Sequence, residues 1–229
     1  MSTPLRLVIF DVDGTLVDSQ RQILAAMAVA FEAAGIEMPA RTDVLGIVGL
    51  SLPVAMSRLV PDAGKAKLGA LVEGYKSAYM AMRDAGGENA LAPLYPYARD
   101  ALDELAAVPD ILLGIATGKS RRGLDHLLAA HDLGGIFVTE QVADHHPSKP
   151  HPSMLHRALA ETGADPAQAV MIGDTGFDME MACAAGFHGI GVSWGYHSSA
   201  RLASAGAGQI IGDFRALPEA LTQFWNGAV

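Results

Sequence analysis

The chain has 229 residues, of which 50% are hydrophobic and 18% are charged, and its formal net charge is −9. This is enough for one substantial core, or for a core with a small second module. The acidic balance argues against a nucleic-acid partner, because proteins that bind nucleic acids present a basic surface to the phosphates. No membrane-length apolar run and no secretory signal pattern is evident, so we expect no membrane partner and a cytoplasmic location. The one cysteine excludes an internal disulfide, in keeping with a reducing compartment.

The first expected element is a buried strand at residues 5–10, which are mostly apolar and rich in branched side chains. Two carboxylates, Asp11 and Asp13, follow its carboxyl end and lead into a turn at Gly14 and Thr15. Ligands bind at this edge of open α/β sheets. One carboxylate can act there as a nucleophile, while the other exchanges protons or holds a metal through its backbone carbonyl. The alternative is an acidic turn with a glycine at positive φ and a threonine that caps the next helix.

The segment after this turn carries helical patterns and no strand pattern. Apolar residues recur there at helical spacing, and glycines mark the points at which helices stop. The expected helices, and the linker that closes the segment, lie in order at residues 20–34, 51–60, 64–85 and 86–89. We therefore expect residues 17–88 to form an all-helical insertion after the first strand.

Strand and helix patterns alternate from about residue 92 onward, which indicates a doubly wound parallel sheet. The expected strands lie at residues 111–116, 136–138, 169–172, 188–192 and 209–211. The expected helices lie at residues 98–107, 120–131, 152–162, 178–185 and 216–225. The sequence thus predicts an α/β fold in which residues 1–16 and 89–229 form a Rossmann-like core and residues 17–88 form a small all-helical insertion.

Two groups of polar residues in this half suit phosphate binding. Thr117, Gly118, Lys119 and Ser120 follow an expected strand and open a helix, so a hydroxyl, an open backbone and a helix N-terminus lie together. A plain N-cap with a solvated Lys119 is the alternative. Lys149 precedes another expected helix. From this position its ammonium can approach a phosphoryl group as a point charge. The alternative is an ordinary surface lysine.

A third group carries two carboxylates, Asp174 and Asp178, between the end of an expected strand and the start of a helix. Asp178 suits an ordinary helix N-cap, whereas Asp174 has no helix of its own to cap. Mg²⁺ prefers a few hard oxygen ligands and keeps several waters. Asp11, the backbone carbonyl of Asp13 and Asp174 would supply such a set.

These signals follow one order along the chain, namely DxDGT, Thr117, Lys149 and then GDxxxD. In that order they resemble the haloacid dehalogenase superfamily of phosphohydrolases, and the resemblance covers residues 5–221. The expected helical insert is similar to the helical cap of that superfamily. Residues 94–96 and 191–196 resemble its phosphoglycolate-phosphatase-like branch.

The resemblance implies a catalytic role for four residues. Asp11 would be the nucleophile that forms an aspartyl-phosphate. Asp13 would protonate the leaving oxygen and later deprotonate water. Thr117 and Lys149 would bind the phosphoryl oxygens, and a carboxylate nucleophile needs such charge compensation against a phosphate dianion.

The resemblance also implies the metal site. Asp174 would hold Mg²⁺, and Asp178 would support the metal or orient toward Lys149. The expected metal ligands are therefore Asp11, Asp13, Asp174 and Asp178. Gly118 stands where relatives often carry asparagine, so one side-chain contact to the substrate would be missing here.

The cap is expected to determine the substrate specificity. The loop that carries Gly49 and Ser51 lies between expected cap helices, and its small residues allow a close approach to the site. We therefore expect Gly49 and Ser51 to bind substrate together with Thr117, Gly118 and Lys149. An ordinary glycine-rich turn between helices is the alternative.

Together these features predict a Mg²⁺-dependent phosphatase, a monomer or homodimer, that acts on a small phosphorylated metabolite. A sugar-phosphate mutase would have the same core residues and stays open. A phospho-accepting signalling domain also uses aspartates, a threonine and a lysine on a parallel sheet, but its acceptor follows a later strand. Asp13 argues against a true dehalogenase, which lacks the second aspartate of the motif. A phosphonate hydrolase needs a reactive cap lysine, and Lys65, Lys67 and Lys76 fit a solvated helix face.

Overall fold

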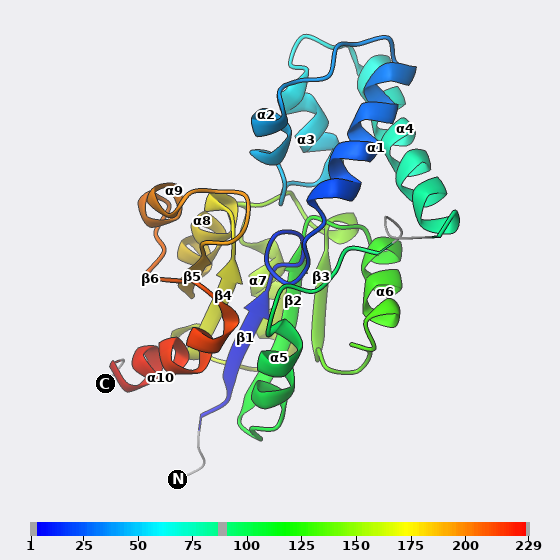
Figure 1. Ribbon diagram of the computed structural model, residues 1–229. Coiled ribbons are helices and arrows are strands. Elements are labelled where there is room, and N and C mark those ends of the chain that lie inside the picture. The colour runs from blue at the N-terminus through cyan, green and yellow to red at the C-terminus, as the bar shows by residue number, and fades with distance from the viewer. Residues whose placement is uncertain (1–3, 87–90, 228–229) are drawn as a thin grey trace.

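The computed structural model describes residues 4–86 and 91–227. In this part of the chain six strands form one parallel sheet in the order β3-β2-β1-β4-β5-β6 (Figure 1). Strand β1 pairs with β2 on one side and with β4 on the other. The order reverses beside β1, and in open α/β sheets ligands bind at the carboxyl ends of the strands at such a point. The predicted doubly wound α/β fold is confirmed.

Five of the six strands begin within one residue of their predicted start. The strands are β1 Arg6–Phe10, β2 Ile111–Thr117, β3 Thr139–Val142, β4 Ala169–Gly173, β5 His188–Val192 and β6 Gln209–Ile211. The strand predicted at residues 136–138 is wrong, because β3 begins at Thr139 and Val138 is 56% exposed. Thr139 and Gln141 of β3 are polar, and both donate hydrogen bonds to Glu161. An edge strand of this kind has no apolar alternation to reveal it.

Helices cover both faces of the sheet, which buries it on two sides. On β1, Val8 and Phe10 face a core cluster shared with α5, α6 and α10, and Leu7 and Ile9 face a second cluster shared with α7 and α8. These helices are α5 Ala98–Ala106, α6 Arg121–Ala130, α7 Ser153–Thr162, α8 Gly176–Ala185 and α10 Leu217–Gly227. A short helix that the sequence did not predict, α9 (Ser199–Ser204), follows β5.

Four of the five helices described between β1 and β2 form a separate layer, which we call the cap (Figure 1). They are α1 Gln20–Ala33, α2 Arg41–Leu45, α3 Leu52–Leu59 and α4 Lys65–Asp84. The cap has its own apolar cluster, built around Met27, Phe31, Met56 and Leu71. Helix α2 was not predicted, since five residues are too few to show a helical period.

The predicted linker at residues 86–89 lies outside the described residues except for its first glycine. The division into a core and a cap domain at residues 16/17 and 88/89 therefore stays a prediction. None of the helices within the described ranges is both long and apolar enough to cross a bilayer.

Candidate active site

The carboxyl ends of β1, β2 and β4 bring the motif residues together. Asp11 follows β1, Thr117 ends β2 and Asp174 follows β4. The backbone N–H of Asp11 donates to the carbonyl of Ile172, 2.9 Å away, and this bond continues the β1–β4 ladder. Lys149, which precedes α7, reaches the same point. All four side chains are almost fully buried, which is exceptional for the three charged ones and requires them to satisfy one another or a ligand.

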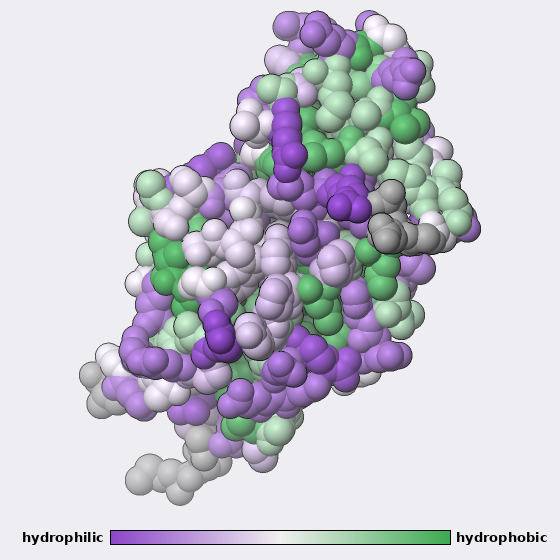
Figure 2. Space-filling view, viewed as in Figure 1, coloured by the Kyte–Doolittle hydropathy of each residue, from purple (hydrophilic) through white to green (hydrophobic). Residues whose placement is uncertain are grey.

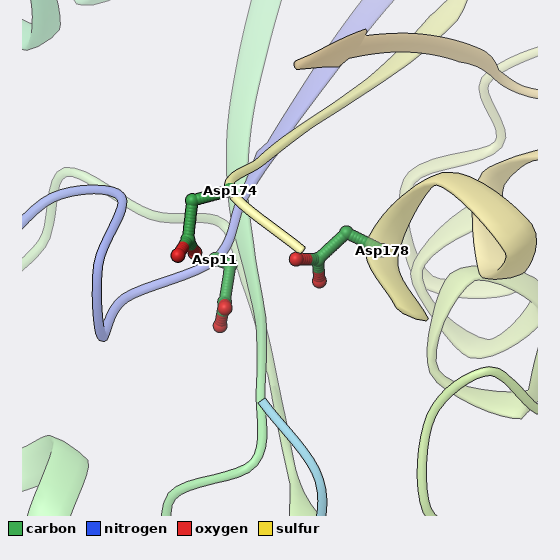
Figure 3. Close-up of side chains that lie close together, drawn as sticks. All are labelled: Asp11, Asp174 and Asp178. Carbon is green, nitrogen blue, oxygen red and sulfur yellow. The ribbon is translucent and has the colours of Figure 1, made fainter. Parts of the chain in front are cut away.

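Three carboxylates and one ammonium form the centre of the site. One oxygen each of Asp11, Asp174 and Asp178 lies within 4.8 Å of the others (Figure 3). Lys149 Nζ lies 2.9 Å from Asp11 Oδ1 and 2.6 Å from Asp178 Oδ1. No described residue donates a hydrogen bond of good geometry to either oxygen of Asp11. Three buried carboxylates beside one ammonium, with two Asp11 oxygens that lack a well-aligned hydrogen-bond donor, fit a hard divalent cation such as Mg²⁺.

The crowding of the carboxylates is reflected in their proton affinity. Burial raises the pKa of Asp11 to about 7; nearby Lys149 opposes this shift and the charge of Asp178 adds to it. Burial also raises the pKa of Asp174 well above its usual value, with the charges of Asp11 and Asp178 adding to the effect. A bound cation would favour the charged forms of both groups.

Two neighbours to which the sequence analysis gave no role at the site, Thr15 and Tyr196, hold Asp174 in place. Thr15 Oγ1 donates to Asp174 Oδ1 at 3.1 Å, and the backbone N–H of Tyr196 donates to Oδ2 at 2.8 Å. Thr15 therefore contacts the site and does not cap α1, whose N-cap is Ser19. Gly14 has φ +84°, and a Cβ there would lie 2.3 Å from Asp174 Oδ2. The glycine and threonine of the first motif thus position the carboxylate of the last one.

Asp178 is not the N-cap of α8, and that reading of the sequence is wrong. The N-cap is Thr175, whose hydroxyl and backbone N–H both donate to Asp178 Oδ2, at 2.7 and 3.1 Å. Asp178 Oδ1 accepts from Lys149. Both oxygens of Asp178 therefore already have donors, and the carboxylate orients Lys149 toward Asp11.

Lys119 is not solvated, so the alternative reading of its motif is wrong for this residue. Its Nζ lies 2.7 and 2.8 Å from the two carboxylate oxygens of Asp13, and the two side chains are only 10% and 13% exposed. Ser120 does cap α6, as that reading expected, because its hydroxyl accepts from the N–H of Gly123 at 3.2 Å. In the sequence, Lys119 was marked only by its position two residues after Thr117, within the group of residues that suits phosphate binding.

The loop of residues 46–51 connects α2 to α3 and lies against the core. The N–H of Ser51 donates to Ser148 Oγ at 2.9 Å, and His197 Nε2 donates to the carbonyl of Gly46 at 3.2 Å. A Cβ at Gly118 would lie 2.7 Å from the carbonyl oxygen of Gly49. The glycine at position 118 therefore leaves space that the cap loop occupies.

A cavity of about 810 Å³ opens between cap and core. Its walls include Asp11, Asp13 and Thr117 from the core and Gly49 and Ser51 from the cap loop. The remaining cap wall is partly apolar and aromatic, with Ile23, Met27, Tyr75, Tyr79 and Met80. Figure 2 shows hydrophilic residues gathered along the seam below the cap on one face. A cavity of this size holds a small organic molecule.

Comparisons with known proteins agree with this architecture. A family model described as haloacid dehalogenase-like hydrolase matches residues 8–192. A protein named probable phosphatase IndB, from Dickeya dadantii, is 33% identical over 211 residues, which cover 91% of this chain and 90% of that protein. A phosphoglycolate phosphatase from Haemophilus influenzae is 29% identical over 223 residues, which cover 95% of this chain and 98% of that protein.

A solved structure of a haloacid dehalogenase-like hydrolase from Streptococcus pneumoniae superimposes with a TM-score of 0.80. It is 26% identical, and the match covers 94% of this chain and 98% of that chain. The likeness therefore includes the cap as well as the sheet.

Proposed function

The chain belongs to the haloacid dehalogenase-like hydrolases, as a phosphatase of that family, and from this we propose that it uses Mg²⁺ and an aspartyl-phosphate to hydrolyse a small phosphomonoester. The observation that carries the proposal is the buried cluster of Asp11, Lys149 and Asp174 at the switch point of the sheet. One carboxylate of this cluster has unsatisfied oxygens and faces a cavity of metabolite size.

In the first step Asp11 attacks phosphorus while the bond to the leaving oxygen breaks. A phosphate dianion repels a carboxylate, and Lys149 offsets part of that repulsion. Mg²⁺, held by Asp11, Asp174 and the backbone carbonyl of Asp13, would neutralise more of the charge on the phosphoryl group. Asp13, whose carboxylate pairs with Lys119, takes up a proton from solvent before this step and donates it to the leaving oxygen, so the alcohol departs neutral and the phosphoryl group stays on Asp11.

In the second step water attacks the same phosphorus. Asp13, now a carboxylate, takes the proton of the water, and the bond between phosphorus and Asp11 breaks. Inorganic phosphate leaves and both aspartates return to their starting state. One residue thus serves as acid and then as base, as a two-step displacement requires.

The other residues bind and orient. Thr117, Gly118 and Lys149 are assigned to the phosphoryl group, because Thr117 and Gly118 line the cavity together with Asp11, and Lys149 Nζ lies 2.9 Å from Asp11. Gly49 and Ser51 of the cap loop are assigned to the rest of the substrate. We infer that Asp178 acts through Lys149, since its two oxygens already accept hydrogen bonds. The named phosphoglycolate phosphatases among the relatives make phosphoglycolate the first substrate to test.

The proposal is tested by a screen of several dozen phosphomonoesters, including phosphoglycolate and sugar phosphates. We expect release of inorganic phosphate from a small number of them. A sugar-phosphate mutase would instead move the phosphoryl group within the sugar and depend on a bisphosphate activator. Isomerised sugar phosphate without net phosphate release would overturn the proposal.

Asp13→Ala should separate the two steps of the reaction. An alkyl phosphate needs an acid at its leaving oxygen, whereas p-nitrophenolate departs easily as an anion. The pre-steady-state burst should therefore slow by about 10²–10⁴-fold with an alkyl phosphate, and only mildly with p-nitrophenyl phosphate. Breakdown of the phosphoenzyme should slow with both esters. Equal loss of burst rate for the two esters would remove the acid role from Asp13.

Ser51→Leu should change substrate preference more than chemistry. The larger side chain enters the cavity at the cap loop, so the ranking of kcat/KM among natural-size phosphomonoesters should change. Slow hydrolysis of p-nitrophenyl phosphate should persist. Ser77→Leu on the exposed side of α4 is the matched control and should leave the ranking unchanged. Equal losses on every substrate would mean that the loop has only a structural role.

A further inference from the structure

Each of the two motif aspartates that face the cavity has its own lysine. Lys149 forms an ion pair with Asp11, and Lys119 forms one with Asp13, with its Nζ 2.7 and 2.8 Å from the two carboxylate oxygens. Among the described residues no other cation forms an ion pair with Asp13. Nothing in the proposed chemistry so far uses Lys119, although its side chain is only 10% exposed. A charged pair shielded from water in this way is short and directional.

The backbone of Lys119 is anchored from two sides. Its N–H donates to Thr117 Oγ1 at 3.2 Å, and its carbonyl accepts from the N–H of Ala143 at 3.0 Å. The ammonium therefore starts from a fixed point at the end of β2. From there the Lys119 side chain extends to the turn that follows β1 and carries Asp13.

The cap also contacts this lysine. Lys119 Nζ lies 5.5 Å from the centre of the Tyr79 ring, which belongs to α4 and lines the same cavity. The ammonium thus lies between a core carboxylate and the electron-rich face of a cap ring.

We propose that Lys119 is a positioning residue for the acid–base step: it fixes the Asp13 carboxylate at the leaving-group side of the cavity, and Tyr79 of the cap fixes Lys119 in turn. The proposal rests on the acid–base role proposed for Asp13. Its consequence is that cap helix α4, through Tyr79, contributes to the placement of the proton donor in the core.

The test is a comparison of Lys119→Met, Asp13→Ala and the double variant, with p-nitrophenyl phosphate and an alkyl phosphate such as β-glycerophosphate. Loss of geometry alone can cost up to about 10²-fold in rate. We expect Lys119→Met to slow the burst by about 10- to 100-fold with the alkyl phosphate and to change it little with p-nitrophenyl phosphate. In the double variant the loss should equal that of Asp13→Ala alone, because Lys119 has no partner left to position.

Two further variants keep the test decisive. Lys119→Arg retains a cation and should restore most of the alkyl phosphate burst rate. Tyr79→Leu, which removes the ring, should give a smaller loss with the same dependence on leaving group. Lys67→Met, an exposed lysine on the same cap helix, is the matched control and should behave as wild type.

The outcomes separate the two ideas. Equal losses for both esters with Lys119→Met, or losses that add to those of Asp13→Ala, would overturn the positioning role while leaving the proposed reaction intact. If Asp13→Ala itself shows no dependence on the leaving group, the acid–base assignment fails, and the positioning role fails with it. Thermal unfolding of every variant identifies a loss that comes only from misfolding.

Discussion

Replacement of Asp11 by asparagine should lower turnover by at least ~10³-fold, as removal of a covalent nucleophile does in other enzymes. The amide keeps the shape of the side chain but has no charge with which to attack phosphorus. The fold should tolerate the change, because Lys149 keeps its 2.6 Å contact with Asp178. One negative charge also leaves a buried cluster in which burial already raises the pKa of Asp11 to about 7.

Rapid quench with ³²P-labelled substrate provides the direct measurement. In the wild type the label should appear on Asp11 within the first turnover, and in Asp11→Asn no protein-bound label should appear. Asp18→Asn is the matched control, because this exposed carboxylate is seven residues further along, outside the cavity, and should leave turnover unchanged. Label on another residue, or normal turnover without any label, would overturn the nucleophile assignment.

The fold was predictable because the strands near the site are apolar and end in polar residues. Residues Leu7–Phe10 of β1 are fully buried, and the carboxylate that follows them is visible as an abrupt change in composition. β2 and β4 show the same change, at Thr117 and Asp174. Parallel strands align their carboxyl ends at one edge, so four motifs far apart in sequence were expected to meet, and the structure places them together.

Features that depend on side chains from two distant segments were not predictable. The sequence placed Lys119 either in a phosphate-binding motif or on the solvated surface, and only the fold places its ammonium beside Asp13. The threonine of the first motif resembles a helix cap, but its hydroxyl binds Asp174, which is 159 residues further along. β3 was misplaced because its buried polar side chains are satisfied by Glu161 of α7 rather than by an apolar face.

The contacts between cap and core also depend on two segments that are distant in sequence, and they too were not predictable. Because members of the family often carry asparagine at this position, Gly118 suggested that one side-chain contact to the substrate is missing. In the folded chain the space beside it is taken by the carbonyl groups of Gly49 and Leu50. A small residue in the core can therefore be explained by the part of the cap that packs on it, and sequence spacing does not contain that information.

Removal of divalent metal should reduce turnover on the order of 10³-fold or more, since a metal supplies several kcal/mol of charge stabilisation to such a transition state. Asp11, Asp174 and Asp178 place three carboxylates within 4.8 Å of one another, Lys149 pairs with two of them, and all of these side chains are buried. Within the described residues no second cation compensates the cluster. Exhaustive chelation should abolish phosphate release, and added Mg²⁺ should restore it. Ca²⁺ should inhibit, because its larger and looser coordination sphere displaces the nucleophile.

Thermal unfolding distinguishes loss of the metal from loss of the chemistry. A cation that binds only the folded state raises the unfolding midpoint, and the rise grows with its concentration. Mg²⁺ should therefore raise the midpoint of the wild type, whereas Asp174→Asn should respond only at much higher Mg²⁺ concentration. Glu180→Gln is the matched control, because this exposed carboxylate on α8 lies outside the cluster and should leave the response unchanged. Full activity after chelation, or an unchanged response to Mg²⁺ in Asp174→Asn, would contradict a metal site at the ends of β1 and β4.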